Sequence, residues 1–198
     1  MLAIGTTEAY MKLTDKDFGD DTYYLGETLE VEGDLDIETP LPTDYFLKEV
    51  RVSGNLTCNS SLLVVDSISV EGDMRCKGSV KVDGKLEAGG LICSGYDVMA
   101  VGEIFAGTVQ AEGDVHTNGS IDVDGDILAR HGSVKSGGYI QSEAEIKARG
   151  EVRARGNIDA VTLKADHLAS ENGSVRIKVH TEYQTIEIPN GTLMTGIK

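Results

Sequence analysis

The chain has no tryptophan and few aromatic residues of any kind. Phe and Tyr together make up 5% of its 198 residues, although apolar residues as a whole make up 40%. A core without large rings has to be filled by Val, Ile, Leu and Ala, so we expect a narrow interior. There are only 3 Pro against 24 Gly. This balance favours a turn-rich, all-β chain of one domain without a proline-rich linker.

Long apolar runs, a secretory signal and a full set of paired cysteines are also missing. No stretch approaches the roughly 18 apolar residues that a membrane span needs. The opening residues 1–15 lack the basic flank and apolar segment of a signal peptide. Three cysteines leave at least one thiol unpaired, which favours a reducing compartment. We therefore expect a cytoplasmic protein without a membrane span.

Positive charge is scarce and lies late in the sequence. The formal net charge is −15, with 25 Asp and Glu against 8 Lys and Arg in residues 1–128 and 8 against 10 in residues 129–198. Binding to a phosphate backbone needs Lys and Arg, so a nucleic-acid partner is not expected. The acidic surface either serves solubility, meets a basic partner, or makes a dipolar rod whose ends attract each other.

The sequence does contain a column of small residues that recurs about every 18 positions. Each member lies two positions after a larger apolar residue. Helices and flat sheets repeat every 3.6 and 2 residues, whereas a coiling chain can repeat at 18. The column reads Cys58, Cys76, Cys93, Ala111, Ala129, Ala148 and Ala165.

Each 18-residue period divides into three units of the form apolar–x–small–x–Gly–polar–apolar. Alternate residues of a unit are expected to point inward. Two further inward columns begin at Val52 and Val64, and a glycine column is expected to provide positive φ or a bend at one corner. The glycine column reads Gly54, Gly72, Gly89, Gly107 and Gly125. We predict an all-β, single-stranded β-helix (a β-solenoid) of about seven turns with a roughly triangular cross-section.

Three segments are expected along the chain. Residues 1–28 form an N-terminal cap containing one short amphipathic helix. Residues 29–170 form the solenoid, with a loop inserted at 39–49. Residues 171–198 alternate like two ordinary strands joined near a Pro-Asn-Gly turn. They are expected to form a cap, or an oligomerisation arm.

Few residues form patterns that suggest chemistry. The three cysteines could hold a soft metal, but without a C-x-x-C spacing or a nearby His they are interpreted as small buried hydrophobes. Asp122, Asp124 and Asp126 begin like a calcium loop but lack the later Glu, so they are weak metal candidates on a solvated stripe. No phosphate-binding loop, dinucleotide fingerprint or nucleophile elbow occurs. We expect no catalytic residue and no cofactor.

Charged side chains supply the candidate interaction surface. The segment 147–155 holds the only dense group of cations, and alternation turns them outward. It lacks the interleaved aromatics of a nucleic-acid site and is expected to complement acidic surface on a neighbouring molecule. The candidate residues are Asp73, Asp114, Lys147, Arg149, Arg153 and Arg155.

The motif V-x-G-D-[LIV]-x-A, repeated over three-unit turns, resembles the bactofilins, which are polymer-forming bacterial cytoskeletal proteins. The matching stretches are VEGDLDI (31–37), VEGDMRC (70–76), AEGDVHT (111–117) and VDGDILA (123–129). The resemblance implies a right-handed β-helix that stacks end to end into filaments without a nucleotide and scaffolds other proteins. The structured ends and the insertion at 39–49 depart from the family pattern.

These observations favour a non-enzymatic scaffold that assembles with copies of itself. One alternative is a capped monomer or dimer that binds another protein through its acidic face, as an inhibitor or nucleic-acid mimic. Another is an acyltransferase built on hexapeptide repeats. In that class, Gly directly follows the large apolar residue, whereas here it comes four residues later.

Overall fold

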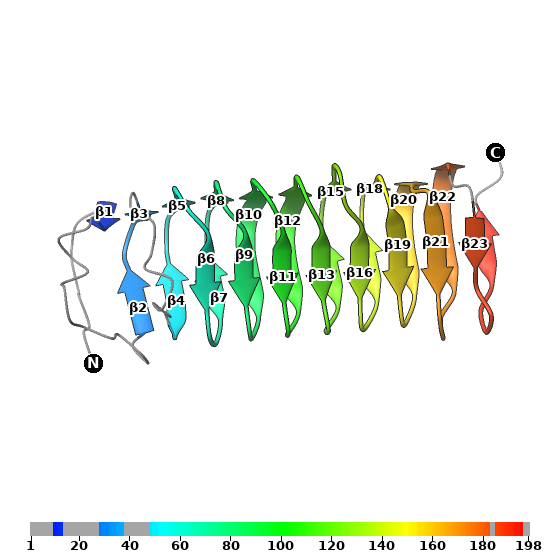
Figure 1. The fold of residues 1–198 in the computed structure, drawn as a ribbon, viewed down its shortest axis with the longest axis horizontal. Helices are drawn as coiled ribbons and strands as arrows, with labels where there is room; N and C mark the ends of the chain where they lie inside the picture. Colours follow the sequence, from blue (N-terminus) through cyan, green and yellow to red (C-terminus); the bar gives the residue numbers. More distant parts are fainter. Residues whose placement is uncertain (1–9, 14–27, 38–47, 183–184, 196–198) are drawn as a thin grey trace.

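The chain forms a straight stack of β-coils. The computed structural model describes residues 10–13, 28–37, 48–182 and 185–195. Within these ranges every regular element is a β-strand, and no helix is long and apolar enough to cross a membrane. Successive coils lie side by side along the longest axis, with the N-terminal strands at one end and the C-terminal strands at the other (Figure 1).

Each full coil contributes one strand to each of three faces. The first face contains β2 (Thr28–Val31), β4 (Glu49–Val52), β7 (Ile68–Val70), β14 (Ile121–Val123), β17 (Ile140–Ser142) and β24 (Leu193–Thr195). Four long strands turn the corner from the first to the second face: β10 (Leu86–Ser94), β12 (Ile104–Ala111), β20 (Ile158–Lys164) and β22 (Val175–Glu182). The two faces therefore form one 16-stranded sheet.

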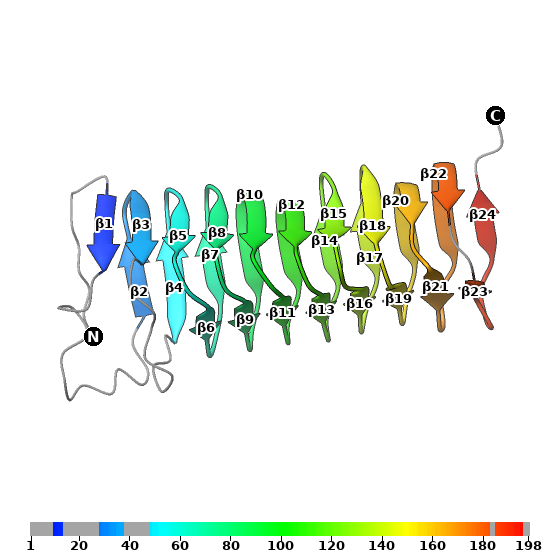
Figure 2. The same ribbon diagram turned by 45° about the horizontal axis from the view of Figure 1, so that its top comes forward.

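The remaining strands complete the second face and form the third. The second face adds β1 (Tyr10–Leu13), β3 (Asp34–Ile37), β5 (Leu56–Cys58), β8 (Met74–Cys76), β15 (Ile127–Ala129) and β18 (Glu145–Ala148). The third face is a separate eight-stranded sheet, seen from another side in Figure 2. It contains β6 (Leu62–Val64), β9 (Val80–Val82), β11 (Val98–Ala100), β13 (Val115–Thr117), β16 (Val134–Ser136), β19 (Glu151–Ala154), β21 (His167–Ser170) and β23 (Thr185–Glu187).

The strand register confirms the predicted β-solenoid. All described strand pairs are parallel, and in the regular coils the partners lie 17 to 19 residues apart. Examples are Ile104 with Ile121, Val50 with Ile68, and Ile121 with Ile140. The inward columns that begin at Val52 and Val64 also stack as predicted. The chain therefore returns to the same point of its cross-section after each coil.

The core is narrow because most strand segments bury a larger residue and, two positions later, a smaller one. In β15, Ile127 and Ala129 are buried while Leu128 between them is half-buried. The large members are Ile, Leu, Val or Met, and no aromatic ring is among the buried hydrophobic residues of the described ranges. Burial at this density, at about 25 cal/mol per Å² of apolar surface, is the main source of stability.

One member of the predicted small-residue column was wrong. Cys93 pairs with Arg75, on the outward side of the second face, and Ser94 stacks on Cys76 and Ala111. The corner between Ala88 and Ile92 is as long as that between Val70 and Met74, so Ser94 takes the inward position. The one-residue shortening falls on the next coil, where the register of β10 on β12 shifts between Ala88 and Leu91.

The same register corrects the glycine column, which contains Gly90 in place of Gly89. The amide of Gly90 donates to the carbonyl of Gly72 at 3.0 Å. The reason for glycine also differs from the expectation, since among the described residues only Gly33 has positive φ, at 101°. At Gly72 a Cβ atom would lie 2.8 Å from the carbonyl oxygen of Gly54. Close approach of successive coils therefore excludes a side chain at this corner.

The ends differ from the predicted segments. Residues 10–13 form a strand that pairs with β3, so the helix expected near them is wrong there, and most of segment 1–28 lies outside the described residues. Most of the insertion at 39–49 also lies outside them, and Glu49 already belongs to β4. The strands expected after residue 170 are present, with a turn at Pro189 and Asn190. They stack in parallel as further coils of the solenoid.

Candidate functional site

A ladder of polar side chains joins successive coils at the corner between the first and second faces. Asp34 accepts a hydrogen bond from the amide of Asn55 at 2.6 Å, and Asn55 accepts one from the amide of Asp73 at 2.9 Å. Asp73 in turn accepts the amide of Leu91 at 2.8 Å. The polar residue after each corner glycine therefore satisfies a backbone donor of the next coil.

Asp73, a candidate interaction residue, is held in this ladder on two sides. Its other carboxylate oxygen forms an ion pair with Arg75 at 2.7 Å. The hydrogen bond from Leu91 and the contact with Arg75 lower the pKa of Asp73. The carboxylate therefore stays charged, but much of its bonding capacity is used within the molecule.

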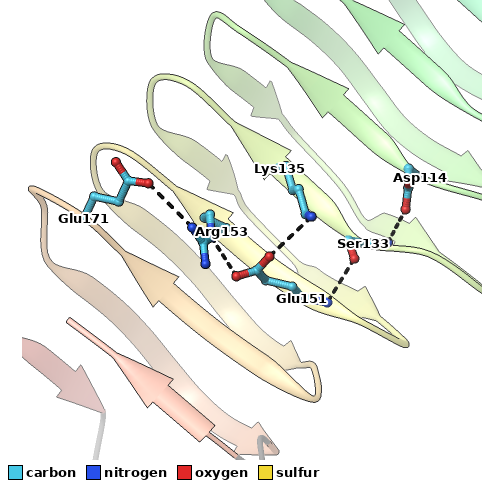
Figure 3. Close-up of polar contacts among 6 residues, drawn as sticks. All are labelled: Asp114, Ser133, Lys135, Glu151, Arg153 and Glu171. Carbon is cyan, nitrogen blue, oxygen red and sulfur yellow. Dashed lines mark hydrogen bonds and ion pairs between the residues drawn. The ribbon is translucent and has the colours of Figure 1, made fainter.

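Asp114 has the same role at the corner between the second and third faces. Its own amide donates to Asp97 at 2.9 Å, and its carboxylate accepts the amide of Ser133 at 2.7 Å. Ser133 then accepts the amide of Glu151 at 3.1 Å, and part of this ladder is drawn in Figure 3. Both acidic candidates thus connect one coil to the next.

The outward side of the third face carries a network of alternating charges. Arg153 contacts Glu151 at 2.6 Å and Glu171 at 3.7 Å, and Lys135 contacts Glu151 at 3.4 Å (Figure 3). Burial of Glu151 raises its pKa, but the hydrogen bond and charge of Arg153 and those of Lys135 outweigh this effect, so the pKa is lowered overall. The same contacts with Glu151 raise the pKa of Arg153.

The predicted basic segment is divided between two faces and two corners. Lys147 points outward from β18 on the second face, and Arg149 lies at the corner that follows. Arg153 belongs to the network on the third face, and Arg155 lies at the next corner. Residues six apart fall on different faces of a three-sided coil. Lys147 and Arg149 therefore lie close to each other, whereas Arg153 and Arg155 lie on a different part of the coil.

A groove on the second face contains both of these cations. It has a volume of about 820 Å³ and lies over β15, β18 and the end of β20. Arg130 and Lys164, which lie outside the predicted basic segment, also line it, together with Glu145 and Asp166. The sequence did contain a signal for this clustering. Ala129, Ala148 and Ala165 were predicted to stack, so the residue that follows each of them was expected at the same corner of successive coils.

The three aspartates proposed as weak metal candidates do not form a metal site. Asp122 points outward from β14, and Asp124 lies exposed at the following corner. Asp126 accepts the amide of Glu145 at 3.0 Å, so it belongs to the corner ladder. Across the described ranges no group of three His, Cys, Asp or Glu side chains could hold a metal ion.

Two of the three cysteines stack inside the core. Cys58 and Cys76 are buried partners on neighbouring coils, and Cys93 is half-buried on the outward side. The hydrogen bond between Cys58 and Cys76, together with burial, raises the pKa of Cys76, while the same bond lowers the pKa of Cys58. The two buried thiols fill positions that other coils give to Ser94 and Ala111.

Buried hydroxyl groups bond to the corners of the preceding coil. Ser94 donates to the carbonyl of Gly78 at 2.8 Å, and Ser136 and Ser142 donate at 2.8 Å to the carbonyls of Gly119 and Gly125. A buried hydroxyl without a partner would be destabilising, so these bonds explain why serine is tolerated in the core.

The chain was also compared with known proteins. No family model, curated protein or solved structure matches it. The stacked coils, the corner ladders and the basic groove are therefore the basis for any functional conclusion.

Proposed function

We propose that the protein is a non-enzymatic, cytoplasmic scaffold of the bactofilin type that assembles end to end with copies of itself. In such an assembly, the last coil of one molecule continues its sheets onto the first coil of the next. Backbone hydrogen bonds along parallel strands would supply the contact, and no nucleotide would be needed.

The state of the C-terminal coil is the observation that supports this proposal. Among the described strands, β23 pairs only with β21, and β24 only with β22. Ile188 and Leu193 pack on the core but remain partly exposed at this end. Strand edges above a partly exposed apolar core favour pairing with another molecule.

Negative-stain electron microscopy with light scattering tests the proposal. We expect the wild-type protein to form filaments. Leu193→Lys should reduce the assembly to small particles, because it places a charge over the core at the end. The control is Met194→Lys, since Met194 is 49% exposed and points away from that core. Circular dichroism of both variants checks that the coils remain folded.

A wild-type protein that forms only particles of one or two chains would contradict end-to-end assembly. Filaments that persist in Leu193→Lys would contradict the role of the C-terminal coil. Either result would direct attention to the alternative, a protein that binds another protein through its acidic face.

A further inference from the structure

The groove over β15, β18 and β20 contains cations from successive coils. Arg130, Lys147, Arg149 and Lys164 line it, against two carboxylates, Glu145 and Asp166. Its floor includes the small residues Ala129, Ala148 and Ala165. Successive strands are about 4.8 Å apart, so the cations form a short row along the rod. The groove therefore fits an elongated anionic ligand.

Two of these cations make no ion pair with a carboxylate in the described part of the chain. Lys147 is exposed, and the guanidinium of Arg149 contacts only the ring of His131, at 3.5 Å. Arg130 differs, because it pairs with Glu112 at 3.1 Å. Lys147 and Arg149 are therefore the cations most available to an incoming anion.

The sequence of the same protein contains a matching acidic segment. Residues 14–27, TDKDFGDDTYYLGE, carry five Asp and Glu against one Lys, together with Phe and two Tyr. Carboxylates complement the row of cations, and aromatic rings can pack on guanidinium groups and lysine side chains. A single-stranded nucleic acid fits less well, because no aromatic side chain lines the groove to stack on its bases.

This segment cannot reach the groove of its own molecule. It is anchored at both ends, because β1 pairs with β3 and β2 pairs with β4. The second face places β18 six strand steps beyond β3, or about 29 Å away at 4.8 Å per step. The path out and back is thus close to 60 Å, whereas fourteen extended residues span at most about 48 Å. If this segment is the occupant, it therefore comes from another copy.

We propose that residues 14–27 of one molecule bind in the groove of a second molecule, and that two molecules lying side by side in opposite directions make this contact twice. The two-fold arrangement closes the assembly as a dimer. The part of the second face that lies between the two contacts turns the uncharged residues Thr57, Cys93 and Gln110 outward. Arg75 on this face is neutralised by Asp73. This lateral contact is separate from end-to-end assembly and does not depend on it.

Sedimentation velocity at low and high salt tests the dimer. In the Leu193→Lys background, in which end-to-end assembly is removed, we expect the protein to dimerise at low salt and to dissociate as salt screens the charges. Lys147→Glu with Arg149→Glu should weaken dimerisation by about tenfold or more, since each exposed pair is lost and replaced by repulsion. Arg155→Glu with Lys178→Glu makes the same charge change outside the groove and should dimerise as the Leu193→Lys parent does.

Charge exchange tests the identity of the occupant. Asp20→Lys with Asp21→Lys should also weaken the dimer, and combining it with Lys147→Glu and Arg149→Glu should restore it. A fluorescein-labelled peptide of residues 14–27 should bind the Asp20→Lys, Asp21→Lys protein. Its affinity should be about tenfold lower for the protein that also carries the two glutamate substitutions in the groove. Fluorescence anisotropy reports this binding.

Several outcomes would overturn the proposal. These are a Leu193→Lys protein that remains monomeric at low salt, equal dimerisation by the groove variant and its control, or no rescue by charge exchange. Leu193→Lys changes β24 on the first face, outside the groove, and should leave the lateral dimer intact. Loss of filaments in that variant with retention of the dimer therefore separates this proposal from end-to-end assembly.

Discussion

Along the second face, one inward position accepts only small side chains from Cys58 to Ala165. Its occupants are Cys, Ser or Ala because the larger residue two positions earlier fills the middle of the narrow core, as Ile127 does before Ala129. Parallel strands about 4.8 Å apart leave no space between the stacked residues. A polar group at this position is tolerated only when it reaches a corner carbonyl, as Ser94 does.

Ala111→Asp should destabilise the protein by several kcal/mol, because an unpaired carboxylate would be buried in the core. Ala111 is 2% exposed. Gln110→Asp, on the outward side of the same strand, is the matched control and should change stability by less than about 0.5 kcal/mol. Thermal melting of the two variants makes the comparison. If Ala111→Asp melts like the wild type, the assigned inward register is wrong.

Asp114 provides a test of whether a corner carboxylate acts through its charge or through its hydrogen bond. Asp114→Asn retains an oxygen that can accept the amide of Ser133, so we expect near wild-type stability. Asp114→Ala removes the acceptor and should cost about 1 kcal/mol. Urea unfolding measures both. Equal losses in the two variants would show that the charge, and not the hydrogen bond, is the stabilising feature.

At the scale of strands and corners, alternation made the fold predictable, but it did not determine every register. The spacing from Cys76 to Cys93 is as acceptable as that to Ser94, because both side chains are small. The length of the corner before them decides, because Ala88 to Ile92 matches Val70 to Met74 and so places Ser94 on Cys76. The direction of Lys147 and Arg153 was predictable for the same reason. Their separation onto different faces follows from the three-sided coil and divides the basic segment.

The continuation of the coil beyond residue 170 had a signal in the sequence. Gly156, Gly173 and Gly191 recur at the spacing of the coils, and a Cβ atom on Gly191 would meet the carbonyl of Gly173. Charged residues such as Arg176 and Lys178 made the segment resemble an ordinary exposed strand. The groove could not be predicted in the same way, because its shape depends on long side chains from three coils.

The charge network on the third face should make stability depend on pH. The pKa of Glu151 is lowered in the folded protein, so its contribution is fully present above the ordinary pKa of a glutamate and is lost as pH falls below it. We expect Glu151→Gln to be less stable than the wild type at pH 7 by about 1 kcal/mol. The difference should shrink at pH 3. Urea unfolding at both values measures this change.

The control for this pH dependence is Glu143→Gln, which removes an exposed carboxylate outside the network. Its stability difference from the wild type should be small at both pH values. A Glu151→Gln difference that is the same at pH 3 and pH 7 would mean that the ion pairs with Arg153 and Lys135 contribute nothing measurable.

For the whole molecule, nearest-neighbour contacts predict graded protection from hydrogen exchange. Each coil packs only on the coils before and after it, so opening is expected to begin at the ends. Amides in β10 to β15 should exchange most slowly, and those in β23 and β24 fastest. Mass spectrometry of the exchanged protein measures this order. Uniform protection would instead indicate that the rod opens in a single step, or that assembly protects its ends.

The register shift at Gly89 has a consequence for how such a protein can change in size. The corner in β12 is one residue shorter than the corner in β10, yet Ala88 and Ser94 on either side remain stacked on Ala106 and Ala111. Coils of slightly different length are therefore compatible neighbours. Removing residues 112–129 would join Ala111 to Arg130 at an equivalent point of the cross-section, and shorten the rod by about 4.8 Å. Deletion or duplication of one coil could thus adjust the spacing between its two ends without altering either of them.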